Sequence, residues 1–437
     1  MSTASLPTLR QDLATAGATL PTCDQPDVLA QPLTLGTRVA PNRLAIQPME
    51  GCDGEPDGSP GELTLRRYRR FAAGGAGLLW VEAIAVTEEG RGNPRHLWLH
   101  EGNVDAYRRM VDATREAARQ ACGHEVVLIA QLTHAGRYAK PYGTPRPVVA
   151  YNNPYYEGDH PLPAECIATD DQLRALEDDF GRVTKLAVLA GFDGVDIKAC
   201  HRYLGSELLS AFVRPGPYGG DYEGRTAFYR HSVVAARAAC PADFLVTSRL
   251  NLYDGVPTPY GWGQDADDYT KTDLTEPLQL IGELHEGGMK LLNVTMGNPY
   301  VNPHVNRPYR RGGYQPPEHP LKGVERILSG ARAVQQAYPN LAVMASGISY
   351  LGDAGDVVAA GMVREGWASL VGFGRMAFAY PDFARDILEG RGLQKNKSCL
   401  ACTKCTELMR ARCTAGCPVR DQEVYLPLYR EHCMNRG

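Results

Sequence analysis

The sequence predicts a (β/α)8 barrel followed by a short cysteine-rich extension. Three observations predict this fold: eight short apolar runs recur along the chain, helical patterns separate most of them, and cysteines concentrate near the C-terminus. Near-continuous apolar runs are expected of parallel strands that are covered on both faces. We expect an N-terminal arm over residues 1–31, the barrel over residues 32–390 and the extension over residues 391–437.

The eight apolar runs are the expected strands. They cover residues 42–49, 77–83, 125–132, 193–198, 244–249, 290–295, 341–345 and 368–373. Helices are expected between most of them, for example over 277–286 and 323–337, and Thr169 with Gln172 can form a capping box that starts another. An open doubly wound sheet would give the same alternation, but the strand number and the lack of a dinucleotide-binding glycine fingerprint favour a barrel.

The composition is that of an ordinary globular protein. Of the 437 residues, 43% are hydrophobic and 22% are charged, and the net charge of -4 gives no reason to expect nucleic acid or an anionic membrane as a partner. No apolar run reaches the roughly 18 residues that a membrane span needs. The polar N-terminus does not resemble a signal peptide. We therefore expect a soluble cytoplasmic protein; whether it forms a homo-oligomer stays open.

Two insertions interrupt the alternation. Residues 138–167 are rich in Pro, Tyr and Asn, and residues 296–322 contain several Pro, Gly and Arg. They follow the third and sixth expected strands, and active sites of such barrels lie at the carboxyl ends of the strands. We interpret them as lids over a site, with structural decoration as the alternative.

Several short motifs occur in a fixed order along the barrel. They include Asn42-Arg43 with Pro48-Met49, the segment 131–137 (QLTHAGR), the segment 191–197 (GFDGVDI), His201-Arg-Tyr-Leu204 and the segment 372–375 (GFGR). This ordered set resembles the old yellow enzyme (NADH:flavin oxidoreductase) family, and within it the 2,4-dienoyl-CoA reductase branch. The resemblance implies an oxidoreductase with FMN at the carboxyl end of the barrel.

The chemistry of FMN indicates which residues would hold it. Its phosphate needs backbone N–H groups and a cation, which barrels supply after strands seven and eight. An amide that donates and accepts suits the pyrimidine edge, and a cation near N1 stabilises reduced flavin. The resemblance adds three positions that contact flavin with their backbone. The expected FMN residues are Ser346, Gly347, Gly374 and Arg375 for the phosphate, Gln131 and Arg249 for the ring, and Pro48, Met49 and Ala83 from the resemblance.

The residues that bind the substrate and donate a proton to it are expected on the segment after the fourth strand. Reduction of a C=C bond conjugated to a carbonyl needs donors for the enolate oxygen and an acid for the α-carbon. The resemblance assigns Lys198 and His201 to the two donor positions and Tyr203 to the proton donor, with Lys198 replacing the usual histidine. At another departure, Glu50 follows Pro-Met where the family often has Thr or Cys. His134, Arg137 and His319 are further, weaker candidates.

Five of the twelve cysteines lie between residues 399 and 417. The spacing predicts a metal site made by Cys399, Cys402, Cys405 and Cys417, with Cys413 as competitor for the fourth position. The resembling branch binds a [4Fe–4S] cluster with a similar run, which has one more residue between its second and third cysteines. Four thiolates hold such clusters but also hold structural zinc, which is the alternative metal.

The function predicted from these features is FMN-dependent reduction of an activated C=C bond in a small unsaturated molecule, a conjugated enone or an enoyl thioester. Reductases of the resembling branch continue into modules that bind FAD and NAD(P)H, which the printed sequence does not contain. Electrons are therefore expected from NAD(P)H acting directly on FMN, or from an electron-transfer protein through the cluster. The alternatives are an amine dehydrogenase or demethylase, an RNA-modifying flavin barrel, and a non-catalytic metal-binding scaffold without flavin.

Overall fold

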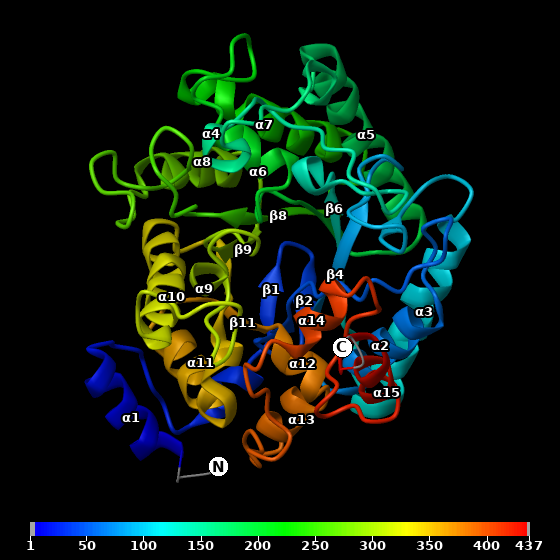
Figure 1. The fold of residues 1–437 in the computed structure, drawn as a ribbon. Helices are drawn as coiled ribbons and strands as arrows, with labels where there is room; N and C mark the ends of the chain where they lie inside the picture. Colours follow the sequence, from blue (N-terminus) through cyan, green and yellow to red (C-terminus); the bar gives the residue numbers. More distant parts are fainter. Residues whose placement is uncertain (1–4, 435–437) are drawn as a thin grey trace.

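In the computed structural model, which describes residues 5–434, eight parallel strands close into a barrel surrounded by helices (Figure 1). Strand β3 pairs with both β11 and β4, which closes the ring. The predicted fold class and all eight expected strands are confirmed. The barrel strands are β3 (Leu44–Ile46), β4 (Leu78–Ala85), β6 (Val127–Thr133), β7 (Gly194–Ile197), β8 (Leu245–Asn251), β9 (Leu291–Thr295), β10 (Ala342–Ala345) and β11 (Leu370–Phe373).

Amphipathic helices cover the outside of the barrel. The Thr169 hydroxyl accepts from the Gln172 backbone, and the Gln172 side chain accepts from the Thr169 backbone, so the predicted capping box starts α5. Helix α8 begins at Thr275, two residues before the predicted Pro277. The longer outer helices are α2 (Glu62–Ala73), α3 (Val104–Cys122), α5 (Asp170–Leu189), α7 (Tyr222–Ala238), α8 (Thr275–Glu286), α10 (Pro320–Ala337) and α11 (Gly355–Arg364).

A small hairpin seals the amino end of the barrel. Strands β1 (Leu33–Leu35) and β2 (Arg38–Ala40) pair antiparallel, and Gly36 turns the chain between them with a positive φ of 63°. Leu35 and Ala40 are fully buried, and they pack with inward-facing residues near the starts of the barrel strands, including Trp80. This apolar floor leaves the carboxyl ends of the strands as the place for polar chemistry.

The segment predicted as an N-terminal arm carries helix α1 (Ser5–Ala16) and a 3-10 turn, η1 (Pro26–Ala30). Leu9 and Leu13 of α1 are buried, and α1 contacts α10, so the described part of this segment packs on the barrel. Residues 1–4 of the arm and residues 435–437 of the extension lie outside the described part. Between residues 5 and 434, no helix combines the length and the apolar character needed to cross a bilayer.

The C-terminal extension folds back onto the barrel (Figure 1). After α12 (Arg375–Ala379) and α13 (Phe383–Leu388), it contains α14 (Lys404–Arg410) and α15 (Tyr425–Tyr429). The buried Asp421 pairs with Arg66 of α2 at 2.7 Å. The Ala415 N–H and the Thr414 hydroxyl both donate to the Gly51 carbonyl, at 2.6 and 3.0 Å. The extension is therefore attached to the loop that follows the first barrel strand.

Candidate active site

The barrel interior below its carboxyl rim centres on a buried carboxylate, Asp196 of β7. Its side chain accepts from Trp80 Nε1 at 2.7 Å and from Gln131 Nε2 at 2.6 Å. Its second oxygen accepts from the Arg249 backbone N–H at 2.6 Å. Burial raises the pKa of Asp196 to about 6. The three hydrogen-bond donors favour the charged carboxylate and so partly offset this effect of burial. The sequence analysis did not single out Asp196, although it orients Gln131 and fixes the backbone of Arg249.

Two cations at this rim are buried without an opposite charge bonded to them. The Arg249 Nε and the Arg375 Nη1 have no hydrogen-bond partner within residues 5–434. Burial lowers the pKa of Arg249. Uncompensated buried guanidinium groups are costly unless a bound group accepts from them. The unpaired donors fit an anionic, acceptor-rich ligand, and FMN offers both a phosphate and ring carbonyls.

The predicted phosphate residues lie at the ends of adjacent strands. Ser346 and Gly347 follow β10, and Gly347 has a positive φ of 89° that favours glycine. Gly374 and Arg375 follow β11, where Arg375 Nη2 donates to the Pro308 carbonyl at 2.7 Å. A Cβ added to Gly374 would lie 3.1 Å from Met49 Sδ, which leaves little room for a side chain.

The remaining flavin positions lie at the ends of β3 and β4. Pro48 and Met49 lie just after β3, separated from it by one residue, and Ala83 lies within β4 with its carbonyl 3.0 Å from His96 Nε2. Glu50 follows Met49, and its carboxylate accepts from Asn93 at 2.7 Å. The structure thus brings all nine predicted FMN residues to the carboxyl-terminal parts of six barrel strands (β3, β4, β6, β8, β10 and β11) and the turns after them.

The three predicted substrate residues lie on one buried turn after β7. Lys198 Nζ sits 3.6 Å from the centre of the Tyr203 ring. His201 has a positive φ of 65°, which is costly for a residue with a Cβ, and its buried Nε2 has no partner among the described residues. The next residue, Arg202, also has a positive φ, and its buried guanidinium lies 3.4 Å from Asp254. Arg202 therefore anchors the strained turn that presents His201.

Burial sets the protonation of this group. It lowers the pKa of His201 well below the ordinary value, which leaves a neutral imidazole at pH 7. It also lowers the pKa of Lys198. Burial, with nearby Tyr300 and Glu50, raises the pKa of Tyr203 well above its usual range, so this hydroxyl keeps its proton. A protonated phenol beside two nitrogen donors is suited to general-acid chemistry.

The two insertions meet over this turn and supply residues that the sequence analysis missed. Tyr138 of the first insertion stacks on Tyr300 of the second, with ring centres 3.7 Å apart. Asn298 Nδ2 lies 3.4 Å from the Tyr138 hydroxyl and 3.3 Å from that of Tyr156. The Tyr300 hydroxyl is 3.4 Å from that of Tyr203. The tyrosine content of the insertions was visible in the sequence, but their meeting was not.

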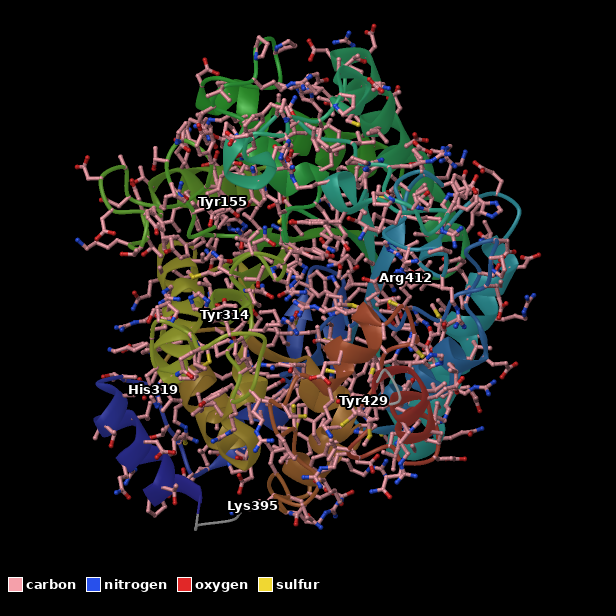
Figure 2. All side chains as sticks on the ribbon, viewed as in Figure 1. Tyr155, Tyr314, His319, Lys395, Arg412 and Tyr429 are labelled. Atoms are coloured by element: carbon pink, nitrogen blue, oxygen red, sulfur yellow. The ribbon has the colours of Figure 1, made fainter. Side chains whose placement is uncertain are left out.

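Further out, each insertion also carries an exposed tyrosine, labelled in Figure 2. Tyr155 belongs to α4 (Pro154–Glu157) of the first insertion, and Tyr314 belongs to the second. Each has about 41% of its surface exposed. Both insertions thus extend from the buried turn, where Tyr138 and Tyr300 stack, to the surface, as lids over a site would.

The three weaker candidates, Arg137, His134 and His319, make contacts that stabilise the fold. Arg137 pairs with Glu207 at 2.9 Å and with Glu157, joining the first insertion to α6 (Leu204–Leu209). His134 Nδ1 accepts from the Gly136 N–H at 3.0 Å, and burial lowers its pKa to about 4. His319 Nδ1 accepts from the Leu321 N–H at 3.2 Å and caps α10. These contacts give each of the three side chains a structural role, so their presence in the sequence does not require a catalytic one.

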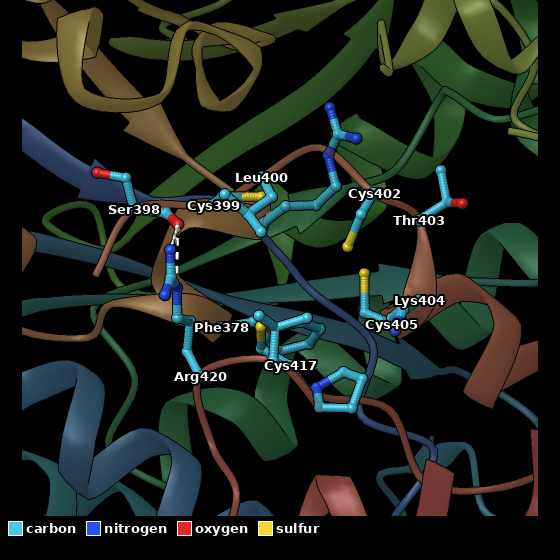
Figure 3. Close-up of a pocket in the computed structure, with 13 residues that line it drawn as sticks. Phe378, Ser398, Cys399, Leu400, Cys402, Thr403, Lys404, Cys405, Cys417 and Arg420 are labelled. Atoms are coloured by element: carbon cyan, nitrogen blue, oxygen red, sulfur yellow. Dashed lines mark hydrogen bonds between the residues drawn. The ribbon is translucent and has the colours of Figure 1, made fainter. Parts of the chain in front are cut away.

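The four predicted metal-binding cysteines line one pocket (Figure 3). Its empty volume, including the open mouth, is about 370 Å³, and Arg375 forms part of its wall. Ala401 and Thr403 have positive φ values of 51° and 62°, which curl the chain between the first three cysteines. Arg420 closes one side by donating to the Ser398 carbonyl at 3.2 Å. The pocket lining includes Cys399, Cys402, Cys405 and Cys417.

Cys413, the competitor for the fourth position, lies elsewhere. It packs in a separate apolar cluster with Leu408, Tyr425 and Tyr429 and does not line the pocket. In the part of the chain that the structure describes, no three His, Cys, Asp or Glu side chains converge tightly enough to hold a single metal ion. The four cysteines therefore share a pocket without forming a preassembled one-ion site.

Comparisons with known proteins place this barrel among flavin oxidoreductases. A metal reductase of Desulforamulus reducens is 27% identical over 386 residues, which cover 86% of this chain and 51% of that protein. This chain spans about half the length of the first curated relatives that it matches.

Solved structures share the fold. A complex of 2-naphthoyl-CoA reductase superposes with a TM-score of 0.72 at 19% identity, over 90% of this chain and 57% of that one. An old yellow enzyme homologue from Zymomonas mobilis superposes with a TM-score of 0.63 at 20% identity, over 84% of this chain and 94% of that one.

The family model described as the NADH:flavin oxidoreductase / NADH oxidase family matches residues 28–394, a range that contains the whole predicted barrel segment of residues 32–390. Proteins of this family are flavin-dependent oxidoreductases, and FMN and NAD(P)H are their cofactors. The chain belongs to the NADH:flavin oxidoreductase / NADH oxidase family.

Proposed function

We propose that this protein reduces a C=C bond conjugated to a carbonyl group, in a small enone or enoyl thioester, with Tyr203 as the proton donor. The observation that carries the proposal is the buried turn on which Lys198, His201 and Tyr203 lie together at the rim of the barrel. When bound, FMN supplies the hydride in such a reaction. The nine residues described above would hold it, with Arg249 and Gln131 at the ring and Arg375 at the phosphate.

The protein's own residues supply binding and the proton. Lys198 and His201 are suited to hold the carbonyl oxygen, since each offers an N–H and the negative charge grows there as the double bond is reduced. The raised pKa of Tyr203 keeps its hydroxyl protonated until a carbanion-like α-carbon accepts the proton. The insertions cover the turn and limit access of water.

The same residues argue against an amine dehydrogenase. Lys198 Nζ already occupies the face of the Tyr203 ring, where an aromatic pocket for a cationic amine would bind its substrate. A second cation beside it would be repelled. A neutral carbonyl or an anionic substrate is favoured instead, because both accept from the lysine.

We also propose that Cys399, Cys402, Cys405 and Cys417 hold a [4Fe–4S] cluster that passes electrons to the flavin from a partner protein, besides direct reduction by NAD(P)H. The shared pocket supports this ligand set, and the position of Cys413 outside the pocket argues against Cys413 as the fourth ligand. Arg375 belongs both to the wall of this pocket and to the predicted phosphate site, so the two cofactors would be neighbours. No disulfide forms between residues 5 and 434, which suits a reducing compartment such as the cytoplasm.

Protein purified without oxygen tests both proposals. We expect flavin absorption bands together with a broad shoulder that dithionite bleaches, and about four irons with four sulfides per chain. Reduced protein mixed with 2-cyclohexen-1-one should reoxidise its flavin, whereas an amine substrate should not bleach oxidised flavin. In Y203F, flavin reduction by NAD(P)H should persist while enone turnover falls by roughly 10²-fold or more. Bleaching by amines but no reoxidation by enones would contradict the proposed direction.

A further inference from the structure

We infer that Tyr300, in the second insertion, is the relay residue that returns a proton from solvent to Tyr203 after each turnover. The inference rests on the proposed function, because it concerns the recovery of the acid that Tyr203 provides. Tyr300 lies outside the motifs that the chain shares with the family.

The proposed chemistry leaves Tyr203 with a proton to recover. When Tyr203 protonates the α-carbon, its O–H bond breaks, a C–H bond forms and a phenolate remains. Only 3% of Tyr203 is exposed, so bulk water has little access to that phenolate. The raised pKa of Tyr203 means that the phenolate is a strong base that takes up any proton within reach. The rate of the next cycle then depends on what delivers one.

The Tyr300 hydroxyl lies in the right place to deliver this proton. The Tyr300 hydroxyl lies 3.4 Å from the Tyr203 hydroxyl, and the two form a hydrogen bond. A phenol can donate one hydrogen bond while it accepts another. Tyr203 can therefore point its proton at the substrate while it accepts from Tyr300. In the return step the Tyr300 O–H breaks as the Tyr203 O–H forms again, and a solvent-borne acid restores Tyr300.

Part of the Tyr300 residue reaches solvent, unlike Tyr203, while burial raises the pKa of its hydroxyl, which lies on the inner side next to the Tyr203 hydroxyl. About 44% of the surface of Tyr300 is exposed. Its position is fixed by the Tyr138 ring stacked on one face and by its backbone N–H, which donates to Asn298 Oδ1 at 2.9 Å. The residue thus spans from the surface to the buried turn without depending on a mobile side chain.

Other ionisable groups near Tyr203 are engaged differently. Lys198 Nζ faces the ring of Tyr203 at 3.6 Å and not its hydroxyl. The Glu50 carboxylate accepts from Asn93 and from the Cys52 thiol, and neither Glu50 nor Cys52 forms a hydrogen bond with Tyr203 in the described structure. Tyr300 is therefore the neighbour with both a hydrogen bond to Tyr203 and contact with solvent.

The test compares the first turnover with later ones in Y300F, using reduced holoenzyme and 2-cyclohexen-1-one. Tyr203 starts protonated, so the single-turnover rate of Y300F should stay within about twofold of the parent enzyme, while kcat falls by roughly tenfold or more. Imidazole buffer at constant pH and ionic strength should restore kcat in Y300F and leave the parent unchanged. The matched control is Y138F, which removes the hydroxyl of the stacked ring that has no bond to Tyr203.

Each outcome decides the point. A kcat of Y300F equal to that of the parent overturns the relay. A slow first turnover without rescue by buffer also overturns it, because that pattern means Tyr300 only positions Tyr203. Enone turnover that survives in Y203F would instead contradict the proposed role of Tyr203. Failure of the relay and failure of the proposed function are thus separated.

Discussion

Replacing Arg249 by methionine should have opposite effects on the protein without FMN and on the holoenzyme. Arg249 is 8% exposed, and its Nε is buried without a partner among the described residues. In protein without FMN, an uncompensated buried cation is costly, and methionine should raise the free energy of unfolding by about 1–3 kcal/mol. In the holoenzyme the same change removes a charge-assisted hydrogen bond worth about 1.5–3 kcal/mol, which corresponds to FMN affinity weaker by roughly 10- to 150-fold.

R249M should weaken the binding of reduced FMN more than that of oxidised FMN, because the negative charge of the reduced form develops near the arginine. If the lost interaction is made mainly with reduced FMN, its midpoint potential falls by roughly 30–60 mV for a two-electron couple. Chemical denaturation of protein stripped of FMN, fluorescence titration with FMN and dye-coupled potentiometry measure the three quantities.

A fully paired buried arginine provides the matched control. Arg225 donates to Glu276 at 2.7 Å, to the Leu209 carbonyl at 2.8 Å and to the Gly220 carbonyl at 3.0 Å. R225M leaves these acceptors unpaired and should destabilise the protein by about 3–5 kcal/mol, with no change in the flavin potential. If R249M destabilised the protein without FMN as R225M does, and left FMN binding unchanged, the reasoning from the unpaired guanidinium would be refuted.

Two further predictions concern the cysteines and Lys198. C417A should lose most of the iron, measured by iron and sulfide analysis, whereas C413A should keep it because Cys413 lies outside the pocket; equal loss in both variants would count against this ligand set. Burial lowers the pKa of Lys198, so its charge should be lost as pH rises through a value below the ordinary 10.5, and enone reduction should fall over that range. The pH profile of kcat/KM in K198M should lack this alkaline fall, and an unchanged profile would speak against a role for the Lys198 charge.

The barrel was predictable because its strands are encoded locally. Runs such as 77–83 are apolar on both faces, and only a parallel sheet covered by helices buries such runs completely. The Thr169–Gln172 capping box was equally local, since it joins residues three apart. The positions of Gln131, Arg249 and Arg375 at strand ends followed from the same pattern once eight strands were counted.

What the sequence by itself determined is therefore the class of fold, the chemistry-bearing residues near strand ends and the cysteine spacing. Only the tertiary structure decided which residues distant in sequence meet. Tyr300 lies 97 residues from Tyr203, and their hydroxyls are neighbours because two insertions close over one turn. Cys417 rather than Cys413 faces the pocket because the chain packs Cys413 into an apolar cluster with Tyr425 and Tyr429. Which distant residues meet depends on how side chains from several elements pack together, and this packing cannot be predicted from periodicity along the chain.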